Sequence, residues 1–199
     1  YGASALGFIF YDQSPRCIQS EIANQIVAEL NGQVTFAGVF VNEKLDQVHA
    51  IADKVGLNFI QLHGDETPEY WEQVNPAIIK QIKVRTDTED VSDRDEAIAI
   101  TQSRVDDVLT LGHMALLDAY EPGQLGGTGT TFDWSIAAAV ARDSAIVLAG
   151  GLSPDNVDLA ITKVAPWGVD VSSGVETDGV KDLSKIRAFA EAVRESGNA

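Results

Sequence analysis

The chain has 199 residues, of which 45% are hydrophobic and 22% are charged, and these values are typical of one globular domain with a sizeable core. Its formal net charge of -16 argues against nucleic acid or an anionic membrane as a partner, because both attract basic surfaces. Cys17 is the only cysteine, so we expect no internal disulfide and no cysteine-rich metal site.

Seven short apolar segments recur along the chain and are predicted to be β-strands. They are residues 5–10, 35–41, 59–62, 78–84, 114–118, 145–149 and 168–171. Most of them do not alternate in polarity, as is typical of parallel strands that are covered on both faces.

Amphipathic segments between these strands are predicted to be helices. Ser20 is expected to cap the first of them, and Ser153-Pro154 is expected to begin a later one by the rule of a cap followed by proline. Apolar faces are formed by Ile22, Ile26, Val27 and Leu30 in the first helix, by Leu45, Val48, Ala52 and Val55 in the second, and by Val180, Leu183, Ile186, Phe189 and Val193 in the last.

The regular alternation of strand and helix predicts an α/β protein with a parallel sheet and crossover helices. Seven strands and about seven helices fit either a doubly wound sheet or an eightfold barrel that lacks one unit. The pattern alone does not choose between these architectures. No linker or low-complexity tract interrupts it, so residues 1–199 are predicted to form a single domain.

Two glycine-containing segments follow the last two predicted strands. Gly150-Gly151 comes after residues 145–149, and Ser172-Ser173-Gly174 comes after residues 168–171. In phosphate-binding barrels the loops after strands seven and eight present backbone N–H groups to a phosphate. Gly150-Gly151 alone could be only a tight turn, but the two segments together favour a phosphate site.

A third glycine-rich segment lies between the predicted strands at 114–118 and 145–149. It carries Gly126, Gly127 and Gly129, followed by Thr130-Thr131. The lysine that a nucleotide phosphate loop needs after its last glycine is absent. We therefore predict a mobile active-site loop rather than a nucleotide site.

Six segments, in order along the chain, resemble the signatures of the phosphoribosylanthranilate isomerase family. They are residues 5–10 with Ser14-Pro15-Arg16, Gln61-Leu62-His63-Gly64-Asp65-Glu66, Leu116-Leu117-Asp118-Ala119, Gly126-Gly127-Thr128-Gly129 with Thr131-Phe132-Asp133-Trp134, Leu148-Ala149-Gly150-Gly151-Leu152, and residues 168–176. The resemblance covers essentially the whole chain. It implies the phosphate-binding TIM (β/α)8 barrel.

The resemblance also implies a reaction, the Amadori rearrangement of N-(5-phosphoribosyl)anthranilate to the corresponding 1-amino-1-deoxyketose, in tryptophan biosynthesis. This isomerisation needs an acid and a base but no cofactor and no metal. Asp118 matches the family's general acid, and Arg16 matches the arginine that holds the anthranilate carboxylate. Gln61, His63 and Asp170 match positions that face the substrate, although His63 could instead be a structural histidine.

The chain departs from the family pattern at its beginning. Family members open with a strand that carries a Cys-Gly pair, and that cysteine is the general base. Nothing in this sequence matches the pair, and Cys17 lies in the loop after the family's second strand. We therefore expect an amino-terminally incomplete barrel with seven strands. Isomerisation of the substrate by these 199 residues alone should be slow or absent. We expect Cys17 to have no catalytic role.

Two alternatives remain at this point: an inactive phosphate-binding or interaction barrel that has lost its base, and a related barrel enzyme such as indoleglycerol-phosphate synthase. The retained Arg16, Asp118 and Gly126-Gly127 favour the isomerase. No apolar run approaches the ~18 residues of a membrane span, and no signal peptide opens the chain. We expect a cytoplasmic protein, monomeric or homodimeric, with a small phosphosugar as its substrate. Fusion or adjacency to other enzymes of the pathway is left open by the sequence.

Overall fold

A computed structural model of the chain describes residues 1–30, 32–84, 91–118 and 134–197. Its contacts divide it into two compact units. The amino-terminal unit comprises Gly2–Gln81 and Asp107–Met114, and the carboxy-terminal unit comprises Tyr1, Ile82–Asp106 and Ala115–Ala199.

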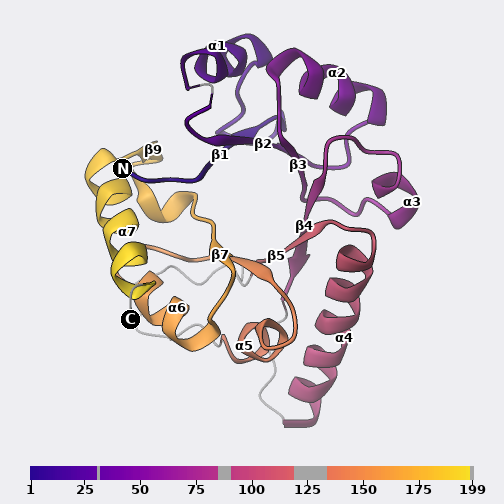
Figure 1. Ribbon diagram of the computed structural model, residues 1–199, viewed down its shortest axis with the longest axis vertical. Helices are drawn as coiled ribbons and strands as arrows, with labels where there is room; N and C mark the ends of the chain where they lie inside the picture. Colours follow the sequence, from indigo (N-terminus) through magenta and orange to yellow (C-terminus); the bar gives the residue numbers. More distant parts are fainter. Residues whose placement is uncertain (31, 85–90, 119–133, 198–199) are drawn as a thin grey trace. The chain divides into compact units, whose positions relative to one another are not determined.

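In the amino-terminal unit, parallel strands alternate with the helices that connect them (Figure 1). The elements are β1 (Ala5–Ile9), α1 (Ser20–Leu30), β2 (Thr35–Phe40), α2 (Leu45–Val55), β3 (Phe59–Leu62), α3 (Pro68–Trp71) and β4 (Ile78–Lys83), which continues into the other unit. Neighbouring strands pair in parallel, with Gly7 opposite Ala37, Gly38 opposite Ile60, and Gln61 opposite Ile79. All carboxyl ends of these strands therefore meet at one edge of the sheet.

The carboxy-terminal unit repeats this arrangement and ends in a hairpin and a helix. Its elements are α4 (Val91–Thr110, whose last turn belongs to the other unit), β5 (Met114–Asp118), α5 (Ser135–Ala141), β6 (Ile146–Ala149), α6 (Val157–Val164), β7 (Gly168–Val169), the 3₁₀ turn η1 (Ser173–Val175), β8 (Glu176–Thr177), β9 (Val180–Lys181) and α7 (Leu183–Ser196). Leu117 pairs with Leu148 and Leu148 with Val169 in parallel register. The short antiparallel pair β8–β9 forms a separate ribbon.

Apolar residues of the strands and helix faces fill the core of each unit. In the amino-terminal unit the rings of Phe8 and Phe36 stack with centroids 5.9 Å apart, and those of Phe10 and Phe40 stack at 5.4 Å. The carboxy-terminal core includes Leu116, Leu117, Ile136, Ile146 and Leu148, all at most 2% exposed. Burial on this scale is the main stabilising contribution to such a fold.

All seven predicted strands are confirmed, and their order in the sheet is the order of the chain, β1 to β7. A doubly wound sheet reverses its strand order at a switch point. The observed order excludes that alternative and agrees with the barrel class.

Three details of the predicted helices were wrong. Ser20 is the first residue of α1 rather than the cap before it, and its hydroxyl donates to the Glu21 carboxylate (3.3 Å). Ser153-Pro154 does not begin a helix, because a turn over residues 154–156 follows and α6 starts only at Val157. Val180 lies in β9 and is 69% exposed, and Leu183, the first residue of α7, is 65% exposed. The buried stripe of α7 is therefore shorter than predicted.

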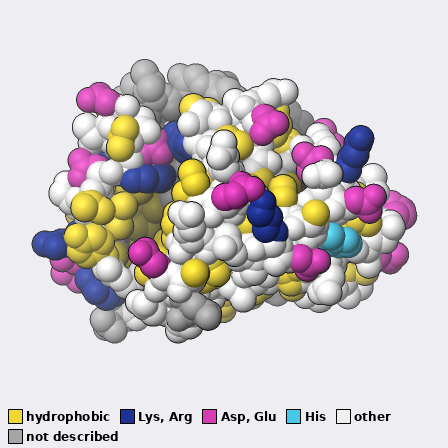
Figure 2. All heavy atoms as spheres, turned by 90° about the horizontal axis from the view of Figure 1, so that it is seen from above, with side chains coloured by type: hydrophobic (Ala, Val, Ile, Leu, Met, Phe, Trp, Pro, Cys, Tyr) yellow, Lys and Arg dark blue, Asp and Glu magenta, His cyan; other side chains and the backbone are white. Residues whose placement is uncertain are grey.

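The surface carries acidic side chains with Lys and Arg among them, and Figure 2 shows both kinds on the visible face. Among the described residues, no helix combines the length and the apolar character needed to cross a bilayer. The same residues contain no group of three or more His, Cys, Asp or Glu arranged to hold a metal ion.

Candidate active site

In the carboxy-terminal unit, three strand ends bring the predicted acid and the first predicted phosphate loop to one edge. Asp118 is the last residue of β5 and lies opposite Ala149, the last residue of β6. Gly150-Gly151 follows directly, and the Asp170 N–H, after β7, donates to the Leu148 carbonyl (2.9 Å). Asp118, Gly150-Gly151 and Asp170 therefore share the carboxyl edge, where barrel enzymes place their chemistry.

The Gly150-Gly151 loop has a backbone conformation that requires glycine. Gly150 has φ 88° and Gly151 has φ 62°, both in the left-handed region. Asn156 fixes the loop, since its amide nitrogen donates to the Gly151 carbonyl (3.0 Å) and its amide oxygen accepts the Ser153 N–H (2.8 Å). This role of Asn156 was not predicted from the sequence. An asparagine three residues after a loop serine was its only signal.

The second predicted phosphate loop packs against the first. Gly174 lies within η1, and a β-carbon placed there would overlap the Leu152 carbonyl oxygen and come within 2.8 Å of the Leu152 carbonyl carbon. Only glycine allows this approach of two backbone segments. Ser172, Ser173 and Gly151 are exposed. The two loops together form an accessible surface of small residues with backbone N–H groups.

Lys181, which was not predicted from the sequence as a site residue, brings a positive charge to these loops. Its Nζ donates to the Ser172 carbonyl (2.8 Å) and to Glu176 Oε1 (2.9 Å). The ribbon β8–β9 holds it there through a turn in which Asp178 (φ 53°) and Gly179 (φ 78°) are both left-handed. Asp-Gly is a strong sequence signal for such a hairpin turn, so this element was predictable.

Replacement of Lys181 by methionine should weaken the binding of inorganic phosphate to the chain about threefold to tenfold, because a nearby positive charge is lost while the loop backbone remains. Titration calorimetry at two salt concentrations measures this effect, which should shrink at high salt. Lys163→Met on α6 is the matched control. Equal phosphate affinity of the Lys181→Met and wild-type chains would contradict the prediction.

Asp118 and Asp170 influence each other electrostatically. The Asp170 residue keeps an exposed surface, but protein atoms crowd round its carboxyl group, and this loss of hydration raises the pKa of Asp170. The neighbouring Asp118 carboxylate raises it further, whereas Lys181 and the Val171 N–H oppose the shift. A carboxyl group with a raised pKa beside a second carboxyl group is an arrangement typical of acid–base sites.

Asp118→Asn should lower the pKa of Asp170, because it removes a negative charge while the hydration of Asp170 stays the same. A raised folded-state pKa means that the contribution of Asp170 to stability is present below its ordinary value of about 3.9 and is lost as the pH rises through the folded value. Asp118→Asn should therefore reduce this loss of stability. A ¹³C NMR titration of Asp170 checks the shift, with Asp158→Asn on α6 as the control, and an unchanged titration of Asp170 would refute it.

In the amino-terminal unit, the predicted substrate-binding residues lie at the carboxyl edge of β1 and β3. Cys17 forms a parallel bridge to Ile9, the last residue of β1, which sets the exposed Arg16 beside that strand end. Gln61, in β3, is 7% exposed, and its amide nitrogen lies 2.7 Å from His63 Nε2. The His63 N–H donates to the Phe40 carbonyl (2.9 Å). Gln61 and His63 are thus hydrogen-bonded partners.

Cys17 has none of the features of an activated thiolate. It is exposed, and its Sγ lies 3.7 Å from Asp12 Oδ1. Partial burial, the hydrogen bond to Asp12 and the negative charge of Asp12 together raise the pKa of the Cys17 thiol. A catalytic thiolate needs the opposite environment. The prediction that Cys17 is incidental is consistent with these surroundings.

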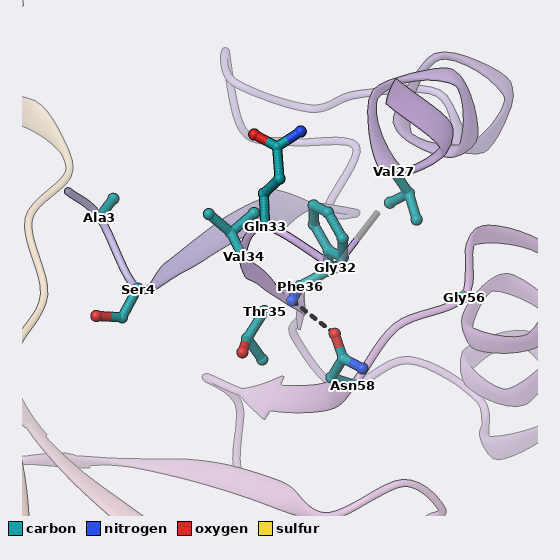
Figure 3. Close-up of a pocket in the computed structure, with 10 residues that line it drawn as sticks. All are labelled: Ala3, Ser4, Val27, Gly32, Gln33, Val34, Thr35, Phe36, Gly56 and Asn58. Atoms are coloured by element: carbon teal, nitrogen blue, oxygen red, sulfur yellow. Dashed lines mark hydrogen bonds between the residues drawn. The ribbon is translucent and has the colours of Figure 1, made fainter. Parts of the chain in front are cut away.

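The predicted active-site loop with Gly126, Gly127 and Gly129 lies outside the described residues. A hollow of about 650 Å³ lies at the amino edge of the strands in the amino-terminal unit, opposite the carboxyl edge that carries Gln61 and His63. It is lined by Ser4, Thr35 and Asn58 among others (Figure 3). Asn58 Oδ1 there accepts the Phe36 N–H (2.8 Å). This edge holds the amino ends of β1, β2 and β3, where residues of barrels serve stability rather than catalysis.

Glycine-serine loops and carboxylates at the carboxyl ends of sequentially ordered parallel β/α units define a phosphate-binding enzyme of the (β/α)8-barrel class. The model of the family described as N-(5′-phosphoribosyl)anthranilate (PRA) isomerase matches residues 1–192. The chain belongs to this family.

Relatives and solved structures agree with this assignment. The N-(5′-phosphoribosyl)anthranilate isomerase of Geotalea uraniireducens is 45% identical over 194 residues, which are 97% of this chain and 89% of that protein. The phosphoribosyl anthranilate isomerase of Thermotoga maritima superimposes with a TM-score of 0.82 at 37% identity, covering 98% of this chain and 89% of that one. A structure of the isomerase in complex with reduced 1-(o-carboxyphenylamino)-1-deoxyribulose 5-phosphate matches with a TM-score of 0.79 at 35% identity, with the same coverage.

Proposed function

We propose that this chain carries the phosphate-binding loops, the general acid and the carboxylate-binding arginine of an isomerase that rearranges N-(5-phosphoribosyl)anthranilate. The observation that carries the proposal is that Asp118, Asp170 and the two glycine-serine loops all lie at the carboxyl edge of the carboxy-terminal unit's strands. Backbone N–H groups of Gly150-Gly151 and Ser172-Ser173-Gly174 bind the phosphate. Family membership supports the substrate class.

Asp118 protonates the ring oxygen as the furanose opens, and this yields an open-chain iminium. A base then removes the proton from C2 of the sugar, and the resulting enaminol tautomerises to the aminoketose. Asp170 contacts the sugar beside the acid, and its raised pKa, caused by desolvation and by the charge of Asp118, places a second titratable carboxyl group at the same edge.

Arg16 binds the anthranilate carboxylate, because a guanidinium group can donate two parallel hydrogen bonds to it. Gln61 and His63 contact the substrate from the end of β3. We also propose a cytoplasmic location and a monomeric or homodimeric state, with the chain either separate from or fused to another enzyme of the tryptophan pathway.

The base is not assigned to any of these 199 residues, since Cys17 is their only cysteine and its thiol pKa is raised.

The 199-residue chain should bind the reduced product analogue yet isomerise substrate at least about 100-fold more slowly than an ordinary family enzyme, because a missing general base typically costs this much. Steady-state consumption of the aminoaldose measures the rate, and Cys17→Ser should not change it. An isomerisation rate equal to that of ordinary family enzymes would refute the statement that none of these 199 residues acts as the general base. Failure to bind the analogue would refute the proposed function itself.

A further inference from the structure

A buried lysine of β4 holds the backbone on both sides of His63. Lys80 is 7% exposed, and its Nζ donates to the carbonyl oxygens of Leu62 (3.4 Å) and Gly64 (2.5 Å). Its third contact is Glu66 Oε2, at 2.8 Å. The three protons of the ammonium group are thus directed at the loop that follows β3.

Glu66 connects this loop to the end of β2. Its Oε1 accepts the N–H groups of Asn42 (2.8 Å) and Gly64 (3.2 Å), and Asn42 Oδ1 accepts the Asp65 N–H (2.7 Å). Burial alone would raise the pKa of Glu66, but the hydrogen bonds from Lys80 and the Asn42 N–H hold it below its ordinary value. Glu66 therefore stays ionised at neutral pH.

Such a buried ion pair is not an efficient source of stability. The Lys80 and Glu66 side chains are 8% and 2% exposed, and the cost of removing two charges from water offsets much of their attraction. An apolar pair of similar volume could be equally stable. An apolar pair could not, however, hold the three backbone groups of Leu62 and Gly64 and the Asn42 N–H in fixed positions, because it offers them no hydrogen bonds.

We propose that Lys80 and Glu66 are positioning residues that set the orientation of the His63 ring at the carboxyl edge of β3. The proposal rests on the proposed function for the statement that His63 contacts substrate. The geometry of the ring follows from its neighbours. Gln61 Nε2 can only donate, so His63 Nε2 accepts, and the ring proton lies on Nδ1. Displacement of the backbone at residues 62–64 would break this hydrogen bond.

Imidazole ¹⁵N NMR tests the proposal directly, since the chain has three histidines and two of them, His49 and His113, serve as internal references. In the wild-type chain at neutral pH, the His63 shifts should be those of the Nδ1-protonated tautomer. Lys80→Met should move them toward the average of exchanging tautomers, and Glu66→Gln should do so less, because glutamine still offers an acceptor to Asn42 and Gly64. Near-UV circular dichroism confirms that each variant is folded.

Lys54→Met is the matched control, since it removes a lysine from an exposed ion pair with Glu21 in the same unit. Lys80→Met should also weaken binding of the reduced product analogue about tenfold, and the control should not. Should Lys80→Met not fold, Glu66→Gln carries the test. Unchanged His63 shifts in a folded Lys80→Met or Glu66→Gln chain would overturn the proposal.

The role of His63 in substrate binding and the positioning role of Lys80 are tested by different variants. If His63→Gln binds the analogue like the wild-type chain, the role of His63 in the proposed function is lost, yet the NMR result for Lys80 still decides the positioning inference. If instead the His63 shifts change in Lys80→Met and in Lys54→Met alike, the effect is not specific to the buried pair, and the positioning inference is wrong.

Discussion

Gly174→Ala should weaken the binding of inorganic phosphate at least about tenfold and lower the free energy of unfolding by about 1–3 kcal/mol or more. The new β-carbon would overlap the Leu152 carbonyl oxygen and lie 2.8 Å from the Leu152 carbonyl carbon and 3.2 Å from Ser153 Cα. These atoms belong to backbone, so no side-chain rotation relieves the overlap. The two phosphate loops must separate.

Gly168→Ala is the matched control for this variant, because a β-carbon there meets only Val147 Cγ2, at an ordinary 3.9 Å. Calorimetric phosphate titrations and thermal unfolding of both variants measure the difference. Phosphate affinity in Gly174→Ala equal to that in Gly168→Ala would show that contact between the loops is not needed for binding.

Gly64→Ala should lower the free energy of unfolding by about 1–3 kcal/mol and weaken binding of the reduced product analogue about tenfold. Its β-carbon would overlap Asn42 Oδ1 and lie 2.7 Å from the Asn42 backbone nitrogen. Asn42 has little freedom to move, since it is itself left-handed (φ 51°) and is tied to Glu66 and Asp65. The loop that carries His63 must shift.

Gly7→Ala in β1 provides the control in the same unit, because its nearest neighbour would be Val39 Cγ2 at 4.0 Å. Urea unfolding gives the stabilities, and calorimetry gives the affinities. A Gly64→Ala chain that is as stable as Gly7→Ala and binds the analogue equally well would contradict the close packing of Gly64 on Asn42.

The strands were predictable because parallel strands covered on both faces are continuous apolar segments, and every one of the seven was confirmed. Their order was not predictable from pattern alone, because local hydrophobicity carries no information about which strands are neighbours. Resemblance to a family supplied the order. The hairpin at Asp178-Gly179 was missed despite a strong turn signal, because the expected apolar stripe of the last helix included Val180.

At the candidate site, the sequence indicated the residues that carry chemistry but not those that hold them in place. Asp118, Arg16 and the glycine-serine loops stand in recognisable motifs. Lys80, by contrast, is one of two lysines in β4, and its partner Glu66 comes 14 residues earlier. Such contacts depend on the register of β3 and β4, which only the three-dimensional structure provides.

The most direct test of the account is an amide ¹H–¹⁵N NMR titration of the chain with inorganic phosphate and then with ribose 5-phosphate. The account predicts saturable shifts at Gly150-Gly151 and Ser172-Ser173-Gly174 with both ligands, and additional shifts at Asp118 and Asp170 with the sugar phosphate only. Shifts confined to the opposite edge, around Ser4 and Thr35, or no saturable shifts at all, would contradict it.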